Sequence, residues 1–129
     1  MIITANGVRV EVAPGVNLSG MDLSGVNLFG ADLSGADLTE TNLFGADLTI
    51  ANLSGANLSD ADLFGANMTG ADLSDADMTG VDMTAANLTG ADMTGANLTG
   101  AIFVAANLTG ANLHGVKAGH GTDFTGATV

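Results

Sequence analysis

The chain has 129 residues, of which 47% are hydrophobic, and its formal net charge is −12. This length fits one domain, and the excess of Asp and Glu opposes binding to nucleic acids and to membranes with anionic lipids. Without Cys, no disulfide or thiolate chemistry is available. The sequence has no apolar run long enough for a membrane span and no secretory signal at its start, so we expect a cytoplasmic protein.

Residues 1–15 are predicted to form an N-terminal cap that contains a β-hairpin. Two β-branched runs, residues 2–4 and 8–12, flank an Asn-Gly pair, which is the strongest short signal for a hairpin turn. Val alternates with charged residues in the second run, so one face of the hairpin is apolar. A repetitive coil needs such a cap because its open end exposes apolar interior and unpaired backbone groups.

Residues 16–115 repeat one five-residue phrase twenty times without interruption. Four copies between Ala51 and Gly70 read ANLSG, ANLSD, ADLFG and ANMTG. We call the Leu the centre of the phrase; it is Leu in fifteen copies and Met or Phe in the others. A helix would scatter residues five apart around its axis, and a straight strand would point them alternately in and out. The centres therefore share one interior only if the chain turns a corner in every repeat, where Gly is usual because it tolerates positive φ.

The phrase A-(D/N)-L-x-x resembles the pentapeptide repeat family, and it covers 100 of the 129 residues. The resemblance implies an all-β fold, a right-handed quadrilateral β-helix with four repeats in each coil and one repeat on each face. Twenty repeats then make five coils, in a rod about 24 Å long at ~4.8 Å per coil. The residues after Gly115 add part of a further coil at the same ~4.8 Å spacing, so we expect about five to six coils in total.

The repeat frame slips by one residue after Gly115. Residues 116–121 contain six residues where five belong, and the phrase then resumes. We expect residues 116–129 to form an irregular, incomplete coil and cap, in which Phe124 lies over the core. His114, His120 and Asp123 lie in this region, but their Gly-rich spacing and the lack of a third His or of a Cys do not predict a metal site.

Large apolar residues occupy several outward positions, and a contiguous apolar patch marks an interaction surface. If four repeats make one coil, residues twenty apart stack, and the outward positions can be sorted by face. The candidate interaction residues are Phe29, Phe44, Ile50, Phe64, Ile102 and Val104. Phe44, Phe64, Ile102 and Val104 are predicted to form one stripe, with Phe29 and Ile50 on the next face. That stripe, or the C-terminal end, is expected to mediate a homodimer.

A second candidate surface is acidic. Glu40 and Asp60 stand where Gly is usual and stack on each other, and the whole candidate surface consists of Asp37, Glu40, Asp60, Asp75 and Asp77. The resemblance includes fluoroquinolone-resistance pentapeptide proteins, which bind DNA gyrase through an acidic β-helix sized like duplex DNA. It therefore implies an alternative function for this chain, a DNA mimic that binds gyrase or another basic DNA-binding protein.

Nothing in the sequence predicts an enzyme, because the Ser and Thr residues are structural by position and no nucleophile–base pair or phosphate-binding loop is present. We expect a non-enzymatic β-solenoid scaffold or protein-interaction module. Its protein partner is unknown, and we expect no cofactor, no direct nucleic-acid binding and no membrane binding. A ladder of outward Thr residues is similar to that of β-solenoid ice-binding proteins, but Thr is favoured on strands in general. The ladder comprises Thr49, Thr69, Thr89 and Thr109.

Overall fold

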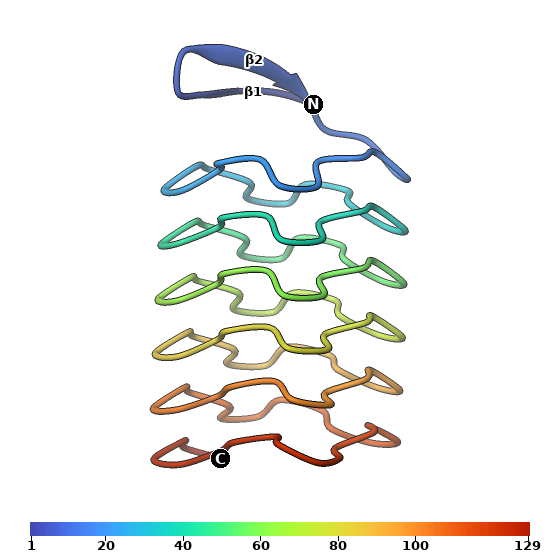
Figure 1. Cartoon of the computed structure of the whole chain (residues 1–129), viewed down its shortest axis with the longest axis vertical. Helices are drawn as coiled ribbons and strands as arrows, with labels where there is room; N and C mark the ends of the chain where they lie inside the picture. Colours follow the sequence, from blue (N-terminus) through green and yellow to red (C-terminus); the bar gives the residue numbers. More distant parts are fainter.

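The structure is a computed structural model that describes all 129 residues. Figure 1 shows a rod of stacked coils, with a small hairpin over its N-terminal end and the C-terminus at the other end. The hairpin consists of β1 (Ile2–Ala5) and β2 (Val8–Glu11), which pair antiparallel. The chain contains no helix, and therefore none that could cross a membrane.

The hairpin lies across the first coil with its apolar side inward. Asn6 and Gly7 both have positive φ, 49° and 78°, as a two-residue hairpin turn of type I′ requires. Ile3 and Val10, which pair across the two strands, are buried in the same core as the coils. The hairpin therefore covers apolar side chains that the first coil would otherwise expose.

Each repeat below the hairpin contributes one residue to a parallel ladder. This residue is the Asp or Asn before the centre, and it pairs with the residue twenty positions later: Asn17 with Asp37, and Asp37 with Asn57. Four repeats therefore make one coil, which confirms the predicted quadrilateral β-helix. After Gly115 the spacing changes by one residue, since Ile102 pairs with Asp123, twenty-one positions later.

The same backbone hydrogen bonds recur in every full coil. The Leu58 N–H donates to the Asp77 carbonyl at 2.7 Å, and the Asp77 N–H donates back to the Ala56 carbonyl at 2.9 Å. The Ala61 N–H donates to the Leu58 carbonyl at 3.0 Å and closes a β-turn, which turns the chain into the next face. The turn limits each extended segment to a single ladder residue.

The interior is a narrow column of centres and of the Ala residues two positions before them. Every centre from Leu23 to Phe103 is fully buried. Thr41 is the one buried polar residue, and its hydroxyl donates to the Leu18 carbonyl at 3.0 Å. At the C-terminal end the ring of Phe124 stacks on that of Phe103, with centroids 5.1 Å apart, so it covers the end of the column.

We number the four faces of the rod by their centres and assign to each face the turn that follows it. Faces 1 and 3 lie on opposite sides, as do faces 2 and 4. The centres of face 1 are Leu18, Leu38, Leu58, Met78 and Leu98, and those of face 2 are Leu23, Leu43, Leu63, Met83 and Phe103. The centres of face 3 are Leu28, Leu48, Met68, Leu88 and Leu108, and those of face 4 are Leu33, Leu53, Leu73, Met93 and Leu113. Coils 1 to 5 begin at residues 16, 36, 56, 76 and 96.

Candidate interaction surface

In nineteen of the twenty repeats the corner is fixed by the side chain of the Asp or Asn before the centre, and Ile102 is the exception. The Oδ1 atom of Asn57 accepts the Ser59 N–H at 3.0 Å and the Ser59 hydroxyl at 2.6 Å. Asp77 accepts the same two bonds from Thr79, at 3.0 and 2.6 Å. Asp and Asn offer the same acceptor atom for this turn. The fold therefore does not decide which of the two stands at a given position, and the charge of each face is independent of the fold.

These hydrogen bonds stabilise the charged form of the carboxylates. The pKa of Asp37 is lowered by the Thr39 hydroxyl and then by the Thr39 backbone N–H, and the pKa of Asp92 is lowered in the same way by Thr94. The pKa is also lowered, by the Ser or Thr two positions on, at Asp22, Asp32, Asp47, Asp77 and Asp123. These groups are all negatively charged at neutral pH.

The twelve acids of the repeats are unevenly distributed among the faces. Face 1 carries Asp37, Glu40, Asp60 and Asp77, face 2 carries Asp22, Asp62 and Asp82, and face 4 carries Asp32, Asp72, Asp75 and Asp92. Face 3 carries only Asp47. The molecule therefore has a strongly acidic side and, opposite face 1, a nearly neutral one.

The five residues of the candidate acidic surface all border face 1. Asp37 and Asp77 lie on the face itself, Glu40 and Asp60 at the corner after it, and Asp75 at the corner before it. A shallow, open depression lies at the N-terminal end of this face, lined by Ser19, Gly20, Asp37, Thr39 and Glu40. No apolar side chain lines the depression, so it offers polar contacts only.

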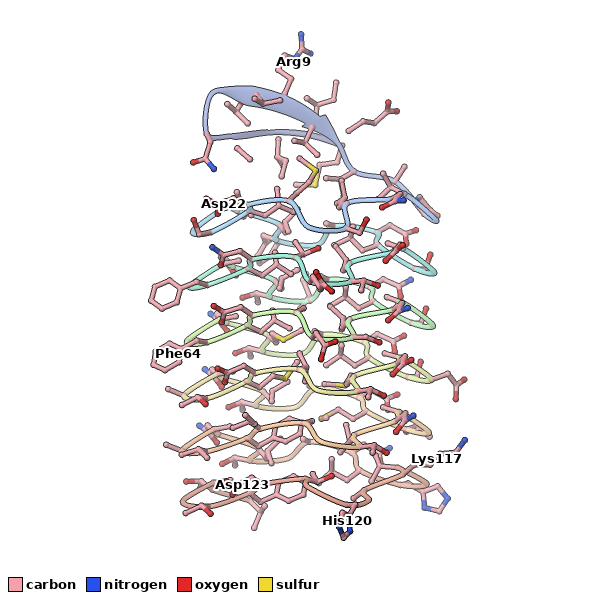
Figure 2. The ribbon with its side chains drawn as sticks, in the orientation of Figure 1. Arg9, Asp22, Phe64, Lys117, His120 and Asp123 are labelled. Carbon is pink, nitrogen blue, oxygen red and sulfur yellow. The ribbon has the colours of Figure 1, made fainter.

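The largest exposed apolar side chains lie at two corners of the rod. Phe44 and Phe64, at the corner between faces 2 and 3, are 51% and 40% exposed, and their rings stack with centroids 5.5 Å apart. Figure 2 shows the Phe64 ring projecting from the edge of the rod. Phe29 and Ile50 belong to the corner between faces 3 and 4 and are 53% and 55% exposed. They flank a hydrogen bond between adjacent coils, from the Gly30 N–H to the Thr49 carbonyl at 2.9 Å.

The predicted stripe of Phe44, Phe64, Ile102 and Val104 is not continuous. The coil between Phe64 and Val104 has Thr84 in the same row, and Asp82 precedes Ile102 in the neighbouring row. Val104 is only partly exposed, whereas Phe44 and Phe64 are exposed. Within the repeats, four of the five exposed large apolar side chains therefore lie in coils 1 to 3, and the fifth, Ile102, lies in coil 5.

Ile50 stands out because its backbone is strained. Its φ is 51°, in the left-handed region, which costs an L-residue roughly 1–2 kcal/mol and is uncommon for a β-branched side chain. Gly occupies this turn position in fourteen of the twenty repeats, and Ile50 is the only β-branched residue there. A strained, exposed apolar residue is more costly to the fold than Gly would be, so it points to a role other than folding.

Comparison with known proteins identifies the family. The sequence model of the pentapeptide repeats matches residues 15–43, 41–80 and 76–115 in eight copies. The chain belongs to the pentapeptide repeat family. Among proteins with curated sequences, none gives a significant match.

Solved structures of pentapeptide repeat proteins are similar to this one. Rfr23 from the cyanobacterium Cyanothece 51142 has a TM-score of 0.83 and 31% identity, over 85% of this chain and 88% of that chain. HetL from Nostoc sp. strain PCC 7120, involved in heterocyst differentiation regulation, has a TM-score of 0.36 and 31% identity, over 88% of this chain and 66% of that chain. A trypsin-treated form of QnrB1, a plasmid-mediated fluoroquinolone resistance protein, has a TM-score of 0.40 and 20% identity, over 88% and 72%. This pentapeptide repeat protein is accordingly a right-handed quadrilateral β-helix.

Two features of the outer surface were not predicted, although the sequence contains a signal for each: the strained backbone of Ile50 and the low charge of face 3. The strain at Ile50 has a visible signal, since Ile occupies a position where the phrase has Gly. The signal for the low charge of face 3 is that Asn, not Asp, stands before four of its five centres. No group of three or more His, Cys, Asp or Glu side chains is arranged to hold a metal ion.

Proposed function

We propose that this pentapeptide repeat protein is a non-enzymatic scaffold that binds a protein through the apolar corners of its first three coils. The stacked, exposed Phe44–Phe64 pair is the observation that carries the proposal. Aromatic side chains dominate the energetics of protein interfaces because they bury a large area with few rotatable bonds. A pair already ordered by stacking on a rigid ladder loses little further conformational entropy on binding.

The fold itself does not require Phe at these positions. The same row carries Ser24 in the coil above and Thr84 in the coil below, with the same turn and the same hydrogen bond to the preceding Asp. Phe44 and Phe64 make that turn through their backbone N–H groups alone. Binding therefore accounts for these two side chains better than stability does.

The test replaces both rings with a residue that the row already contains. The double variant Phe44→Ser/Phe64→Ser should fold like the wild type but lose the proteins that the immobilised wild type retains from an extract of its source cells. The control is Glu40→Gln/Asp60→Asn, which alters the acidic corner and should keep the same bound proteins. If the immobilised wild type, the Phe44→Ser/Phe64→Ser variant and the control variant all retain the same proteins, the proposal is contradicted.

A second candidate is the DNA mimic, supported by the five acids that border face 1. Duplex DNA carries about one charge per 1.7 Å, so a rod about 24 Å long would need about fourteen charges to match it. The twelve acids of the repeats approach that number, but they are spread over four faces and only five of them border face 1. We expect no inhibition of gyrase supercoiling at low micromolar concentration; strong inhibition that is lost in Glu40→Gln/Asp60→Asn would favour the mimic instead.

A further inference from the structure

Face 3 is the least charged side of a molecule with a net charge of −12. Asp47 is its only acid, and the other residues before its centres are Asn27, Asn67, Asn87 and Asn107. The turns at its two edges contain no charged residue either. These turns end in Gly25, Gly45, Gly65, Ala85 and Ala105 on one side and in Gly30, Ile50, Gly70, Gly90 and Gly110 on the other.

This neutrality is not a requirement of the fold. Asp47 accepts the Thr49 hydroxyl at 2.6 Å, and Asn67 accepts the Thr69 hydroxyl at 2.7 Å, so both residue types hold the same turn on the same face. The three other faces carry two or three Asp each at this position. The low charge of face 3 therefore calls for an explanation outside the coil.

Both edges of face 3 carry exposed apolar side chains in the first three coils. Phe44 and Phe64 lie along one edge, and Phe29 and Ile50 along the other. Between these edges lie Asp47 and Asn67, whose Oδ1 atoms accept the hydroxyls of Thr49 and Thr69, and both Thr residues are partly exposed in the row of Phe29. The polar groups of face 3 thus already have hydrogen-bond partners within the chain, and they lie between two edges with exposed apolar side chains. A surface of this composition is typical of one that another molecule covers.

We infer that two copies of this chain associate side by side through face 3. The inference rests on the proposed interaction function and names a partner for it. Two molecules of charge −12 repel each other, and the repulsion is smallest when each presents its single-acid face and points its acidic face 1 away from the other. A basic partner would instead be attracted to faces 1, 2 and 4, which carry eleven of the twelve acids.

The available area is compatible with such a dimer. The accessible surface of 5576 Å² includes the hairpin and both ends of the rod, so each of the four faces offers at most about 1,400 Å². Covering the whole of face 3 on both copies buries at most about 2,800 Å², and specific interfaces bury ~1,200–2,000 Å². Face 3 can therefore supply an interface of that size.

Sedimentation velocity over a range of protein concentrations tests the inference. The wild type should form a dimer that becomes tighter between ~50 mM and ~500 mM NaCl, because salt screens the repulsion between like-charged copies. The variant Thr49→Asp/Thr69→Asp should weaken the dimer by more than about tenfold, since it places like charges against each other in the interface. The control Thr39→Asp/Ser59→Asp adds the same charge in the same two coils on face 1 and should leave most of the dimer.

Ile50→Gly separates association from folding. Removing the strained side chain should raise the melting temperature of the monomer by about 3–5 °C, as expected for the relief of a left-handed residue in a chain of this length. The same variant should weaken the dimer because it removes one apolar contact. A higher melting temperature with an unchanged dimer would show that Ile50 lies outside the interface and would overturn the inference.

Three further results would overturn it. One is a wild type that stays monomeric at high salt and at every concentration, and another is a dimer that the two Asp pairs weaken equally. The third is a dimer that Thr49→Asp/Thr69→Asp leaves intact. If the chain is monomeric yet retains other proteins in a Phe44- and Phe64-dependent way, the proposed function stands and only the choice of partner fails.

Discussion

Replacing Leu58 with Ala should destabilise the coil strongly and locally. Leu58 is fully buried in the middle of the column, with Leu38 and Met78 in the same row of the adjacent coils. The change removes three carbon atoms, which costs about 2.4 kcal/mol of transfer free energy at ~0.8 kcal/mol each. The cavity adds to this, because the ladder bonds at 2.7 and 2.9 Å fix the spacing of the coils and prevent collapse. We expect a total of about 2–5 kcal/mol.

Urea denaturation followed by far-UV circular dichroism measures this loss. The matched control is Ser59→Ala, one residue away on the outside, which loses a single exposed hydrogen bond to Asn57 and should cost less than about 1 kcal/mol. Thermal melting should show a difference of roughly 5–15 °C between the two variants, at a few degrees per kcal/mol for a chain of this length. Equal effects of the two substitutions would refute the assignment of inward and outward positions.

Gly80→Ala should be more costly than Gly90→Ala, although both residues have positive φ, because the new Cβ would overlap the Asp60 carboxylate only at position 80. Adding Asp60→Gly should remove the difference in melting temperature, and a difference that persists would exclude this contact as its cause. Stability should also fall as the pH drops below about 4, because carboxylates whose folded pKa is depressed stabilise the fold above their unfolded pKa and lose this contribution as they are protonated. Changing Asp37 and Asp92 to Asn should reduce the loss of the urea unfolding midpoint at acidic pH, since Asn keeps the turn but does not titrate. If the midpoint still falls as steeply with pH, other groups cause the acid sensitivity.

The repeat makes most of the fold predictable. A period of five with one large apolar residue per phrase permits only a chain that turns in every repeat, and the extra residue after Gly115 shifts the register where the structure shows it. The ladder partners of Asp82 and Asp123 could likewise be deduced by counting residues. These features follow from local spacing, which the sequence displays directly.

The outward surface was harder to predict because it depends on how apolar and polar residues alternate along each row of stacked outward positions. Sorting residues by face placed Phe64, Thr84 and Val104 in one row, but it did not show that Val104 is only partly exposed whereas Phe64 is exposed. The strain at Ile50 depends on the φ of a turn position, which the phrase indicates only through its usual Gly. Binding depends on such details and not on the repeat itself.

The division of the surface into an acidic side and a neutral side depends on residues twenty apart being stacked. The chain has no Cys, so two introduced Cys residues report this register without interference. Thr69→Cys with Thr89→Cys places the pair at equivalent turn positions of adjacent coils, where the Gly70 N–H donates to the Thr89 carbonyl at 2.9 Å. The ~4.8 Å spacing of adjacent strands lies within the ~4.4–6.8 Å Cα separation that a disulfide spans. Oxidised at high dilution, this variant should form an intramolecular disulfide that mass spectrometry detects, and Thr69→Cys with Thr84→Cys should not. A disulfide between positions 69 and 84, or none between 69 and 89, would contradict the assignment of every residue to its face.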